Sequence, residues 1–480
     1  KLKHSALIIR ERILDIYRER GISEKRLAKV AAMTLGQKNH LDPDRKQQFI
    51  KAGVMHIMAV SGLHTVILSL FVFRMLFFMK GKLKTFRVII TLAILWVYAF
   101  VTGLTPSVLR ATLMYSFLQA GKIIKRDVDS VNSVLASAFM LVLVRPSVIF
   151  DAGFLLSYSA VIFIICFCRD LYQKISFRRR IPDIIWQSAT VTIIAQPGTL
   201  PLTVMKFNRF PVWFILSNIV IVPLASLVII SGVLTIFFYP LPFLSRITGG
   251  FLEFVSGLTE SLTEKAASLP LSTIENIGIS IPECIFLSIS LFLLLKYLLD
   301  RKSIRAAYPL VFLLLFITAG TVQETALKRT GEVIVYNTAG HAAVGIRTGK
   351  HLHSYADSPE VVKEVDRHKA MAGLKETKNL LNGNAFLRIG NSEDNTENLH
   401  ILITDRLTNT IPEKPAPDII ILRGKNPPVD NTFTLDSCTK ALVAGPGVQN
   451  RSAVGSLNAD TLHFVRNHGA FRFNLLYPDK

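Results

Sequence analysis

A series of long apolar runs between Gly53 and Gly320 limits the chain to few folds. A helix that crosses the hydrocarbon core of a bilayer needs about 20 mainly apolar residues. Candidate runs, some short, are 64–79, 87–104, 107–121, 131–145, 152–168, 184–205, 212–239, 283–299 and 304–320. Half of the 480 residues are hydrophobic and 19% are charged, which excludes a disordered chain and disfavours one soluble domain. We expect a multi-pass α-helical membrane protein of about eight to ten helices, some broken or re-entrant.

The flanks of these runs differ from them in composition. Residues 1–52 carry 13 Lys/Arg against 6 Asp/Glu, and residues 1–20 alternate apolar and basic positions at helical spacing, so we expect a basic amphipathic helical approach segment. Residues 53–321 form the predicted membrane domain. Residues 329–480 carry nearly equal numbers of basic and acidic side chains and mix strand-like with helix-like patterns, which predicts a soluble α/β domain. Four cysteines are too few for a disulfide scaffold.

Basic clusters predict the orientation in the membrane. Lys and Arg are enriched in cytoplasmic loops, and they gather around 80–87, 122–126, 169–180 and 296–305. If these loops are cytoplasmic, the C-terminal domain and the N-terminal segment lie on the outer side. About 16 of the basic residues then mark topology and need no ligand, which weakens the net charge of +21 as a sign of a polyanionic partner.

Prolines interrupt two of the runs. Run 184–205 contains Pro197-Gly198 and Pro201, and run 212–239 contains Pro223. Proline removes a donor and clashes with the preceding turn, so we expect kinks or breaks there. Broken helices often bind polar cargo, although a plain kink is also common in membrane helices. Residues 212–239 are expected to be re-entrant or interfacial; alternatively they cross once and 241–265 returns.

Polar side chains inside the apolar runs are candidate functional residues, because burying them in lipid is costly. Such residues spread over at least five helices and suggest a polar interior, although any single Asn or Gln more often makes a helix-packing hydrogen bond. Arg110 suits an anionic cargo, since a guanidinium can bind phosphate through two hydrogen bonds. Ser61-Gly62 would let the backbone approach a phosphate closely. The other positions are His56, His64, Asn132, Asp151, Gln196 and Asn218.

Several motifs in order resemble the ComEC competence family of inner-membrane DNA-uptake channels. They are GVMHIMAVSGLHTVIL (53–68), TGLTPSVLRATLM (102–114), VNSVLASAFMLVLVRPSVIFDAGFLLSYSAV (131–161) and AQPGTLPLTVMKFNRFPVWFILSNIVIVPL (195–224). The resemblance covers about 35–225. Family members usually begin with further helices and a small β-barrel domain, which are not visible here, so we expect the sequence to be a piece of a longer protein.

The resemblance implies a channel for importing single-stranded DNA across the bacterial inner membrane during natural transformation. It also implies an outer DNA receptor and a cytoplasmic ATPase as partners, beside membrane lipids; no P-loop is present in the chain. The candidate residues of the DNA path are His56, Ser61, Gly62, His64, Pro106, Arg110, Asn132, Asp151, Gln196, Pro197, Gly198, Lys206, Asn208, Arg209, Asn218 and Pro223.

The C-terminal region resembles a metallo-β-lactamase-like domain that has lost its metal-binding motif. Residues 332–357 resemble its opening hairpin, but the acidic loop reads Asn337-Thr338-Ala339-Gly340-His341-Ala342. His351 and His353 share a strand face, yet a zinc site needs at least a third ligand. We therefore expect no metal, no cofactor and no nuclease activity.

Two other functions stay open on the residues alone. A transporter of a small or lipid-linked solute also uses polar residues at the midplane. A membrane-embedded enzyme could use His56 and His64, although no nucleophile–base–orienter set can be assembled. Aromatic residues near the prolines, such as Trp186 and Trp213, could stack bases, but interfacial anchoring is the more common role.

Overall fold

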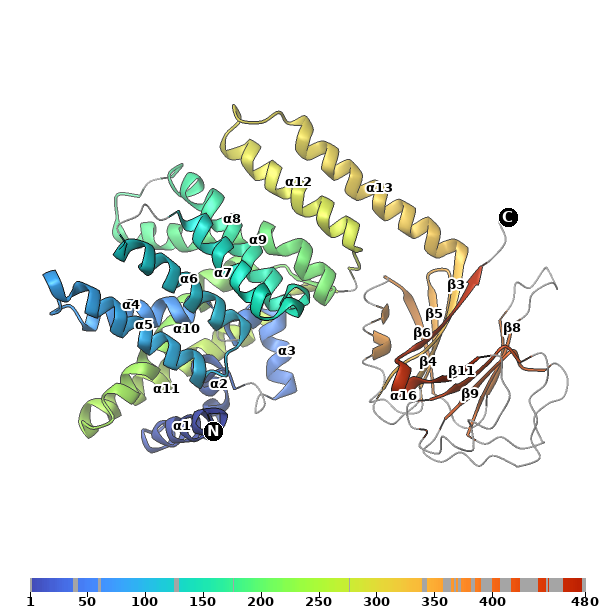
Figure 1. Cartoon of the computed structure of the whole chain (residues 1–480), viewed down its shortest axis with the longest axis horizontal. Coiled ribbons are helices and arrows are strands. Elements are labelled where there is room, and N and C mark those ends of the chain that lie inside the picture. Colours follow the sequence, from blue (N-terminus) through green and yellow to red (C-terminus); the bar gives the residue numbers. More distant parts are fainter. Residues whose placement is uncertain are drawn as a thin grey trace. The chain divides into compact units, whose positions relative to one another are not determined.

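The computed structural model describes most of the chain, and its described part falls into two compact units. The described residues are 2–37, 42–58, 62–124, 129–175, 177–275, 277–338, 343–356, 364–366, 368–369, 373–380, 385–389, 399–405, 416–423, 439–445, 448 and 461–476. One unit comprises residues 1–275 and 284–314, and it is helical; the other comprises 276–283 and 315–480 and contains the large sheets (Figure 1).

The first helices pack into the core of the helical unit. They are α1 (Leu2–Glu19), α2 (Glu24–Leu35), α3 (Pro43–Lys51) and the 3-10 turn η1 (Met55–Met58). Tyr17, Val30 and Met33 are fully buried against residues such as Ile221 and Leu252 of later helices. The amphipathic helix predicted for residues 1–20 is therefore present, and its apolar face joins a large shared core.

Within the described residues, ten helices follow in order as far as Arg329. They are α4 (Gly62–Met75), α5 (Lys84–Val101), α6 (Pro106–Ile123), α7 (Ser130–Val144), α8 (Ala152–Tyr172), α9 (Arg180–Phe207), α10 (Phe214–Phe237), α11 (Pro242–Ala267), α12 (Ile281–Leu299) and α13 (Ala307–Arg329). Among the described residues, α5, α8, α10, α12 and α13 are long and apolar enough to cross a membrane, and α4 and α7 are shorter apolar helices. The prediction of a multi-pass helical membrane protein is confirmed.

Local sequence signals fix several helix ends. The Asp129 carboxylate accepts a hydrogen bond from Val131 N at 2.8 Å, and Asp151 accepts one from Phe154 N at 3.0 Å, so each caps the helix that follows. Pro106 occupies the first turn of α6, where its missing N–H costs nothing. Asn208 ends α9 in the left-handed conformation, with φ of 54°.

The sequence predicts kinks or breaks at the prolines, and the breaks are wrong, whereas the kinks stay a prediction. Pro197 and Pro201 lie inside α9, and Pro223 lies inside α10, and each helix runs on without interruption. The carbonyls that lose their helical donor are Ile193 O and Pro197 O in α9 and Ile219 O in α10. A membrane helix tolerates proline where neighbouring helices compensate for the lost backbone hydrogen bond, and α9 packs closely on Phe163 of α8 at Gly198.

The arrangement of 212–239 also differs from the preferred prediction. This segment forms the single helix α10, and α11 follows it after a short turn and packs closely along it (Figure 1). Among the described residues α10 is a candidate membrane span and α11 is not, so the alternative, in which α11 returns across the membrane, stays a prediction. The basic residues gather in connections that alternate along the chain with less basic ones. These basic connections are α4–α5, α6–α7, α8–α9 and α12–α13.

The second unit contains two five-stranded sheets. The first has the order β12-β3-β4-β5-β6 and the second the order β11-β10-β9-β8-β7. The strands are β3 (Thr330–Val335), β4 (Ala343–Thr348), β5 (His351–Ala356), β6 (Lys375–Leu380), β7 (Ala385–Ile389), β8 (Leu399–Thr404), β9 (Ile419–Leu422), β10 (Ala441–Ala444), β11 (Leu462–Phe464) and β12 (Phe471–Leu476). Buried Val333 and Val335 of the first sheet share a core with Ile401 and Ile419 of the second. A sheet-containing C-terminal domain is thus confirmed.

Candidate functional site

Arg110 lies at the contact between α6 and α8. Only 2% of this residue is exposed, and its Nη1 donates a hydrogen bond to the Gly153 carbonyl at 3.2 Å. The guanidinium lies over the Tyr158 ring at 5.2 Å from the centroid, a cation–π arrangement. Two separate sequence motifs, 102–114 and 131–161, therefore meet at one buried positive charge.

Tyr158 extends this contact to a third helix. Its hydroxyl lies 2.9 Å from Ser137 Oγ of α7, and both residues are buried. Asp151 caps the start of α8, and its carboxylate interacts electrostatically with Arg110. The cluster of Arg110, Ser137, Asp151, Gly153 and Tyr158 joins α6, α7 and α8, and we call it the arginine junction. A change that moves Arg110 would disturb all three helices.

The two histidines of the first motif lie at the start of α4. His64 is buried and His56, in η1, is exposed, and the two imidazoles interact electrostatically. Gly62 faces α6, where a Cβ added to it would be in ordinary van der Waals contact with Ala111 Cβ at 3.6 Å. One turn away, the buried hydroxyls of Thr65 and Thr112 lack hydrogen-bond partners among the described residues. Polar groups therefore concentrate where α4 meets α6.

Gly198 brings α8 and α9 into close contact. A Cβ added at Gly198 would stand 2.8 Å from the Phe163 ring, and Ser159 Oγ donates a hydrogen bond to the Gly198 carbonyl. Phe163, Phe167 and Ile194 continue this interface as a buried cluster. The Pro197-Gly198 pair thus serves a tight helix–helix contact within the described structure.

The end of α9 leads into a small sheet. Strand β1 (Arg209–Pro211) pairs antiparallel with β2 (Thr273–Glu275), and Arg209 lies 3.7 Å from the Glu275 carboxylate. Lys206 is exposed in the last turn of α9, and Asn208 makes the left-handed turn between the helix and the strand. Two cations therefore flank this turn, one of them paired.

The remaining candidates are not brought together. Asn132 and Pro223 are exposed, Gln196 is half-buried, and Ser61 lies outside the described residues. Asn218 is half-buried near the start of α10, and its Oδ1 lacks a hydrogen-bond partner among the described residues. The site is thus a set of separate helix contacts, with the arginine junction and the α4–α6 contact as its most polar parts.

An ion-pair cluster between α2 and α11 was missed in the sequence. Arg26 binds Glu253, and Glu260 receives Lys29, Arg26 and Arg45, the last at 2.9 Å. Lys29 is 2% exposed, and desolvation lowers its pKa to about 8, although Glu260 favours its charged form. The signal was the seven-residue spacing of Glu253 and Glu260, which places both on one helix face. Two carboxylates therefore pair with these three basic residues within the chain and offset two of the three positive charges.

His351 and His353 lie on β5, the third strand of the opening hairpins. His351 pairs across the sheet with Thr348 and Lys375, and His353 with Ile346 and Thr377, so none of the paired residues is a further ligand. No group of three or more His, Cys, Asp or Glu that could hold a metal occurs among the described residues. Asp357 and residues 339–342 lie outside the described part.

Glu332 anchors a buried polar network in the same unit. It pairs with Arg347 at 2.8 Å and with His368 at 3.5 Å, and His368 Nδ1 lies 2.8 Å from the Tyr336 hydroxyl. Hydrogen bonding to His368 and the nearby Arg347 outweigh desolvation and lower the pKa of Glu332 to about 2. Arg347 also donates to the carbonyls of Leu327 and Thr330, which fastens the end of α13 to the sheet.

Fold and site define a multi-pass helical membrane protein whose motif residues meet at helix contacts inside the bundle. The family model described as Competence protein matches residues 33–302, and the chain belongs to this family. The resemblance drawn from the motifs is thereby confirmed.

Two curated relatives extend this result. ComE operon protein 3 of Bacillus subtilis (strain 168) is 32% identical over 203 residues, which cover 42% of this chain and 25% of the relative. A protein of Aquifex aeolicus (strain VF5) described as uncharacterized is 25% identical over 236 residues, which cover 48% of this chain and 54% of the relative. The chain thus spans about a quarter and about half of these relatives, and no solved structure matches it.

Proposed function

We propose that this chain acts in DNA uptake for competence, as the membrane path that carries single-stranded DNA across the bacterial cytoplasmic membrane. The observation that carries the proposal is the meeting of the family motifs at buried polar side chains. His64, Thr65, Arg110 and Thr112 are each at most 2% exposed within a bundle of apolar helices. Such residues are costly in a membrane and are retained where they serve a polar cargo.

Arg110 supplies the fixed positive charge in this scheme. A DNA strand carries a phosphate at every nucleotide, and a guanidinium keeps its charge while donating to phosphate oxygens. The single hydrogen bond to Gly153 and the Tyr158 ring hold Arg110 in place while leaving other N–H donors for a ligand. Movement of α8 relative to α6 would bring those donors to a passing strand.

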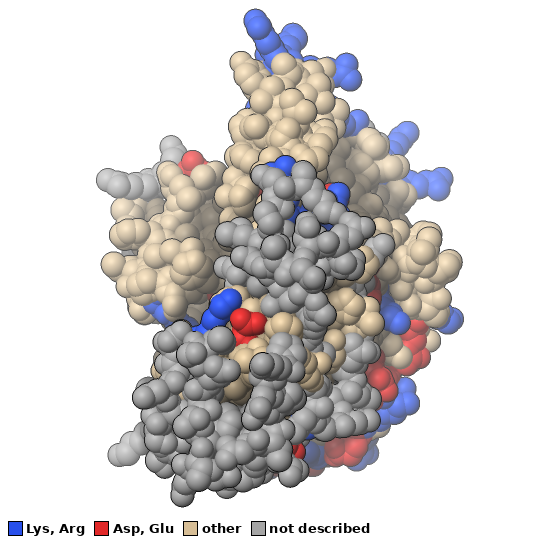
Figure 2. All heavy atoms as spheres, turned by 90° about the vertical axis from the view of Figure 1, so that its right-hand side faces the viewer, with Lys and Arg blue, Asp and Glu red and all other residues tan. Residues whose placement is uncertain are grey.

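The orientation follows from the positive-inside rule. Figure 2 shows Lys and Arg gathered at the upper end of the helical unit, where the α12–α13 turn lies in Figure 1. Arg301, Lys302 and Arg305 occupy this connection. Arg178 and Arg179 lie between α8 and α9, and Arg180 begins α9. We place these ends in the cytoplasm, which puts the C-terminal unit on the outer, periplasmic side.

The driving force is supplied by partners. The sequence has no GxxxxGK[ST] phosphate-binding loop, so a separate cytoplasmic ATPase would pull the strand, and an outer receptor would deliver it. The membrane path itself then needs only a route between helices that is lined by polar side chains, and a fixed positive charge. The helical unit supplies both.

The proposal is tested by transformation with an Arg110→Ala variant of the full-length gene in a transformable host. We expect at least a tenfold loss of DNase-resistant labelled DNA with surface-bound DNA unchanged. The matched control is Lys122→Ala, which removes an exposed cation from the last turn of the same helix. Membrane levels of each variant are measured by immunoblot.

The result also separates the rival functions. Normal uptake in Arg110→Ala and in His64→Ala, at normal membrane levels, would refute the path assigned here. Binding of single-stranded DNA to the purified chain should weaken steeply as salt rises, because counterions are released on binding. A neutral solute carried by a transporter would show no such salt dependence.

A further inference from the structure

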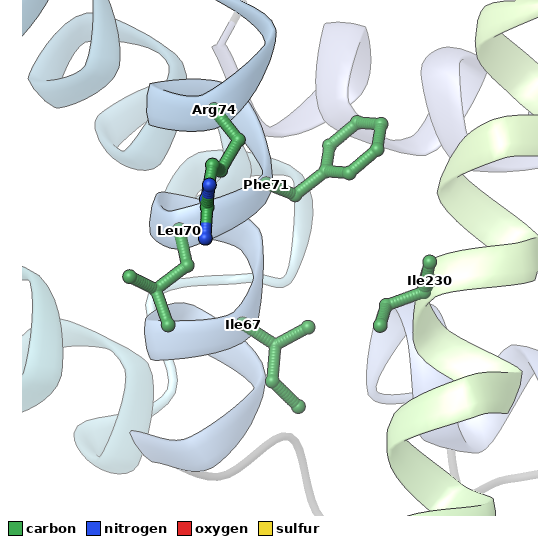
Figure 3. A pocket seen from close by; sticks show the side chains of 5 residues that line it. All are labelled: Ile67, Leu70, Phe71, Arg74 and Ile230. Atoms are coloured by element: carbon green, nitrogen blue, oxygen red, sulfur yellow. The ribbon is translucent and has the colours of Figure 1, made fainter.

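A pocket opens between α4 and α10 in the helical unit. Its volume is about 260 Å³, and it is lined by Ile67, Leu70, Phe71, Arg74 and Ile230. Figure 3 shows four of these side chains on α4, facing Ile230 across the gap, with the Arg74 guanidinium folded down beside Leu70. The lining is thus apolar with one cation at its edge.

Arg74 is available to an anionic ligand. It is exposed in the last turn of α4 and has no hydrogen bond or ion pair in the described structure. Arg87, by contrast, donates to the Phe73 carbonyl from Nε at 2.8 Å and lies over the Phe73 ring. Arg87 is therefore held by the carbonyl and ring of Phe73, whereas Arg74 is free among the described residues.

The chain on either side of Arg74 carries only positive charge. The sequence contains no Asp or Glu from Arg45 to Arg126; the exposed Lys80 lies in the connection to α5, and the exposed Lys84 begins that helix. Basic segments beside a membrane helix attract anionic lipids of the cytoplasmic leaflet. An apolar pocket below such a cluster fits a molecule with an anionic head and a hydrocarbon tail.

We propose that this pocket binds one anionic phospholipid, with an acyl chain along Ile67, Leu70 and Ile230 and the phosphate on Arg74. Arg suits the phosphate because its guanidinium can bind two oxygens at once. The lipid would fill the gap between α4, which carries His64, and α10. This inference goes beyond the proposed import function and does not depend on it.

Nucleic acid fits the pocket less well. A strand of DNA is held by successive phosphate contacts and stacking surfaces along a groove. Here a single cation stands over three aliphatic side chains and one phenyl ring, and no other polar group lines the cavity among the described residues. A hydrocarbon chain gains from burial on such a lining, whereas a sugar or base would lose hydrogen bonds to water.

Native mass spectrometry of the full chain, purified and delipidated in a neutral detergent, tests the proposal. Phosphatidylglycerol and phosphatidylcholine with the same acyl chains are added in parallel. We expect one phosphatidylglycerol to bind at least tenfold more tightly than phosphatidylcholine. Arg74→Gln should abolish this preference, while Lys122→Gln, which removes one exposed cation from α6, should preserve it.

Variants in the pocket separate the tail from the head group. Leu70 is 60% exposed, so the larger side chain of Leu70→Trp would fill the cavity without disturbing the packing of the core. This variant should weaken the binding of both lipids. Ile230→Trp should do the same from α10, with a melting curve to confirm folding. Equal binding of the two lipids, or binding unchanged by Arg74→Gln, would overturn the proposal.

Competition identifies any other ligand. Glycerol 3-phosphate that displaces the lipid at equal concentration would show that the site takes a free phosphate. An oligonucleotide that does so through Arg74 would show that the pocket serves DNA. Either outcome rejects the lipid assignment, and neither decides the role of Arg110.

Discussion

The ammonium of Lys29 on α2 and the carboxylate of Glu260 on α11, 231 positions apart in the chain, lie 3.5 Å from each other. Lys29 is 2% exposed, and it also donates to the Ser256 carbonyl. The pair ties the basic N-terminal segment to a helix of the bundle. It also removes part of the positive charge that the sequence offers to a polyanion.

Glu260→Gln should destabilise the helical unit by about 3 kcal/mol, because a buried Lys29 loses its counter-ion. The change is read as a lower melting temperature of the detergent-solubilised chain. Glu264→Gln, at an exposed residue one turn further along α11, is the matched control and should have little effect. Adding Lys29→Met to Glu260→Gln should recover part of the loss, since no buried charge then remains unpaired.

Gly198→Ala should weaken the α8–α9 contact by about 1–3 kcal/mol, because the new Cβ would meet the Phe163 ring at 2.8 Å. Gly250→Ala in α11 has nothing within 4 Å of the added Cβ and is the control. The better helix propensity of alanine should leave it neutral or stabilising. Equal melting temperatures for the two variants would contradict the close contact.

Variants of Asn208 distinguish a role of this residue in the turn after α9 from a role in the DNA path. Its φ of 54° is strained for most residues, so Asn208→Val should cost about 1–3 kcal/mol. Asn208→Gly should be less destabilising than Asn208→Val and should keep transformation, because glycine adopts this conformation freely. Loss of transformation in Asn208→Gly at normal membrane levels would instead assign the amide a direct function.

Glu332 gives the C-terminal unit a defined acid sensitivity. Its pKa is lowered from 4.5 to about 2, so its stabilising effect is complete above pH 4.5 and is lost as the pH falls toward 2. The effect is worth up to about 3 kcal/mol. Digestion by pepsin between pH 4.5 and 2 should follow this loss in the full chain.

Glu332→Gln should make the C-terminal unit less resistant throughout and remove this pH dependence. Glu324→Gln, which removes an exposed ion pair with Lys350, is the control and should keep the wild-type profile. An unchanged profile in Glu332→Gln would show that another group governs the acid response.

The C-terminal unit should release no nucleotides from single- or double-stranded DNA, with or without Mn²⁺ or Zn²⁺. The reason is the lack of a further ligand beside His351 and His353 in the sheet register. Metal-dependent cleavage that disappears in a His351→Ala, His353→Ala double variant would reverse this prediction.

Most helix positions were predictable, because an apolar run and its flanking polar turns are local signals. The run 131–145 became Ser130–Val144, and Asp129 and Asp151 supplied caps that the pattern already contained. The breaks predicted at the prolines did not occur, because the outcome there depends on tertiary packing and not on a local signal. Whether α9 survives Pro197 depends on its packing with α8 through Gly198, which lies outside the local sequence.

The candidate site divides in the same way. The sequence alone determined that His64 and Arg110 stand in apolar helices, that the motifs follow the order of the competence family, and that two strands follow α13. Only the tertiary structure decided that Arg110 binds Gly153 and that Glu260 pairs with Lys29 and Arg45. Hydrophobic length and periodicity are properties of one segment, whereas the pairing of buried charges depends on which segments the folded chain places side by side.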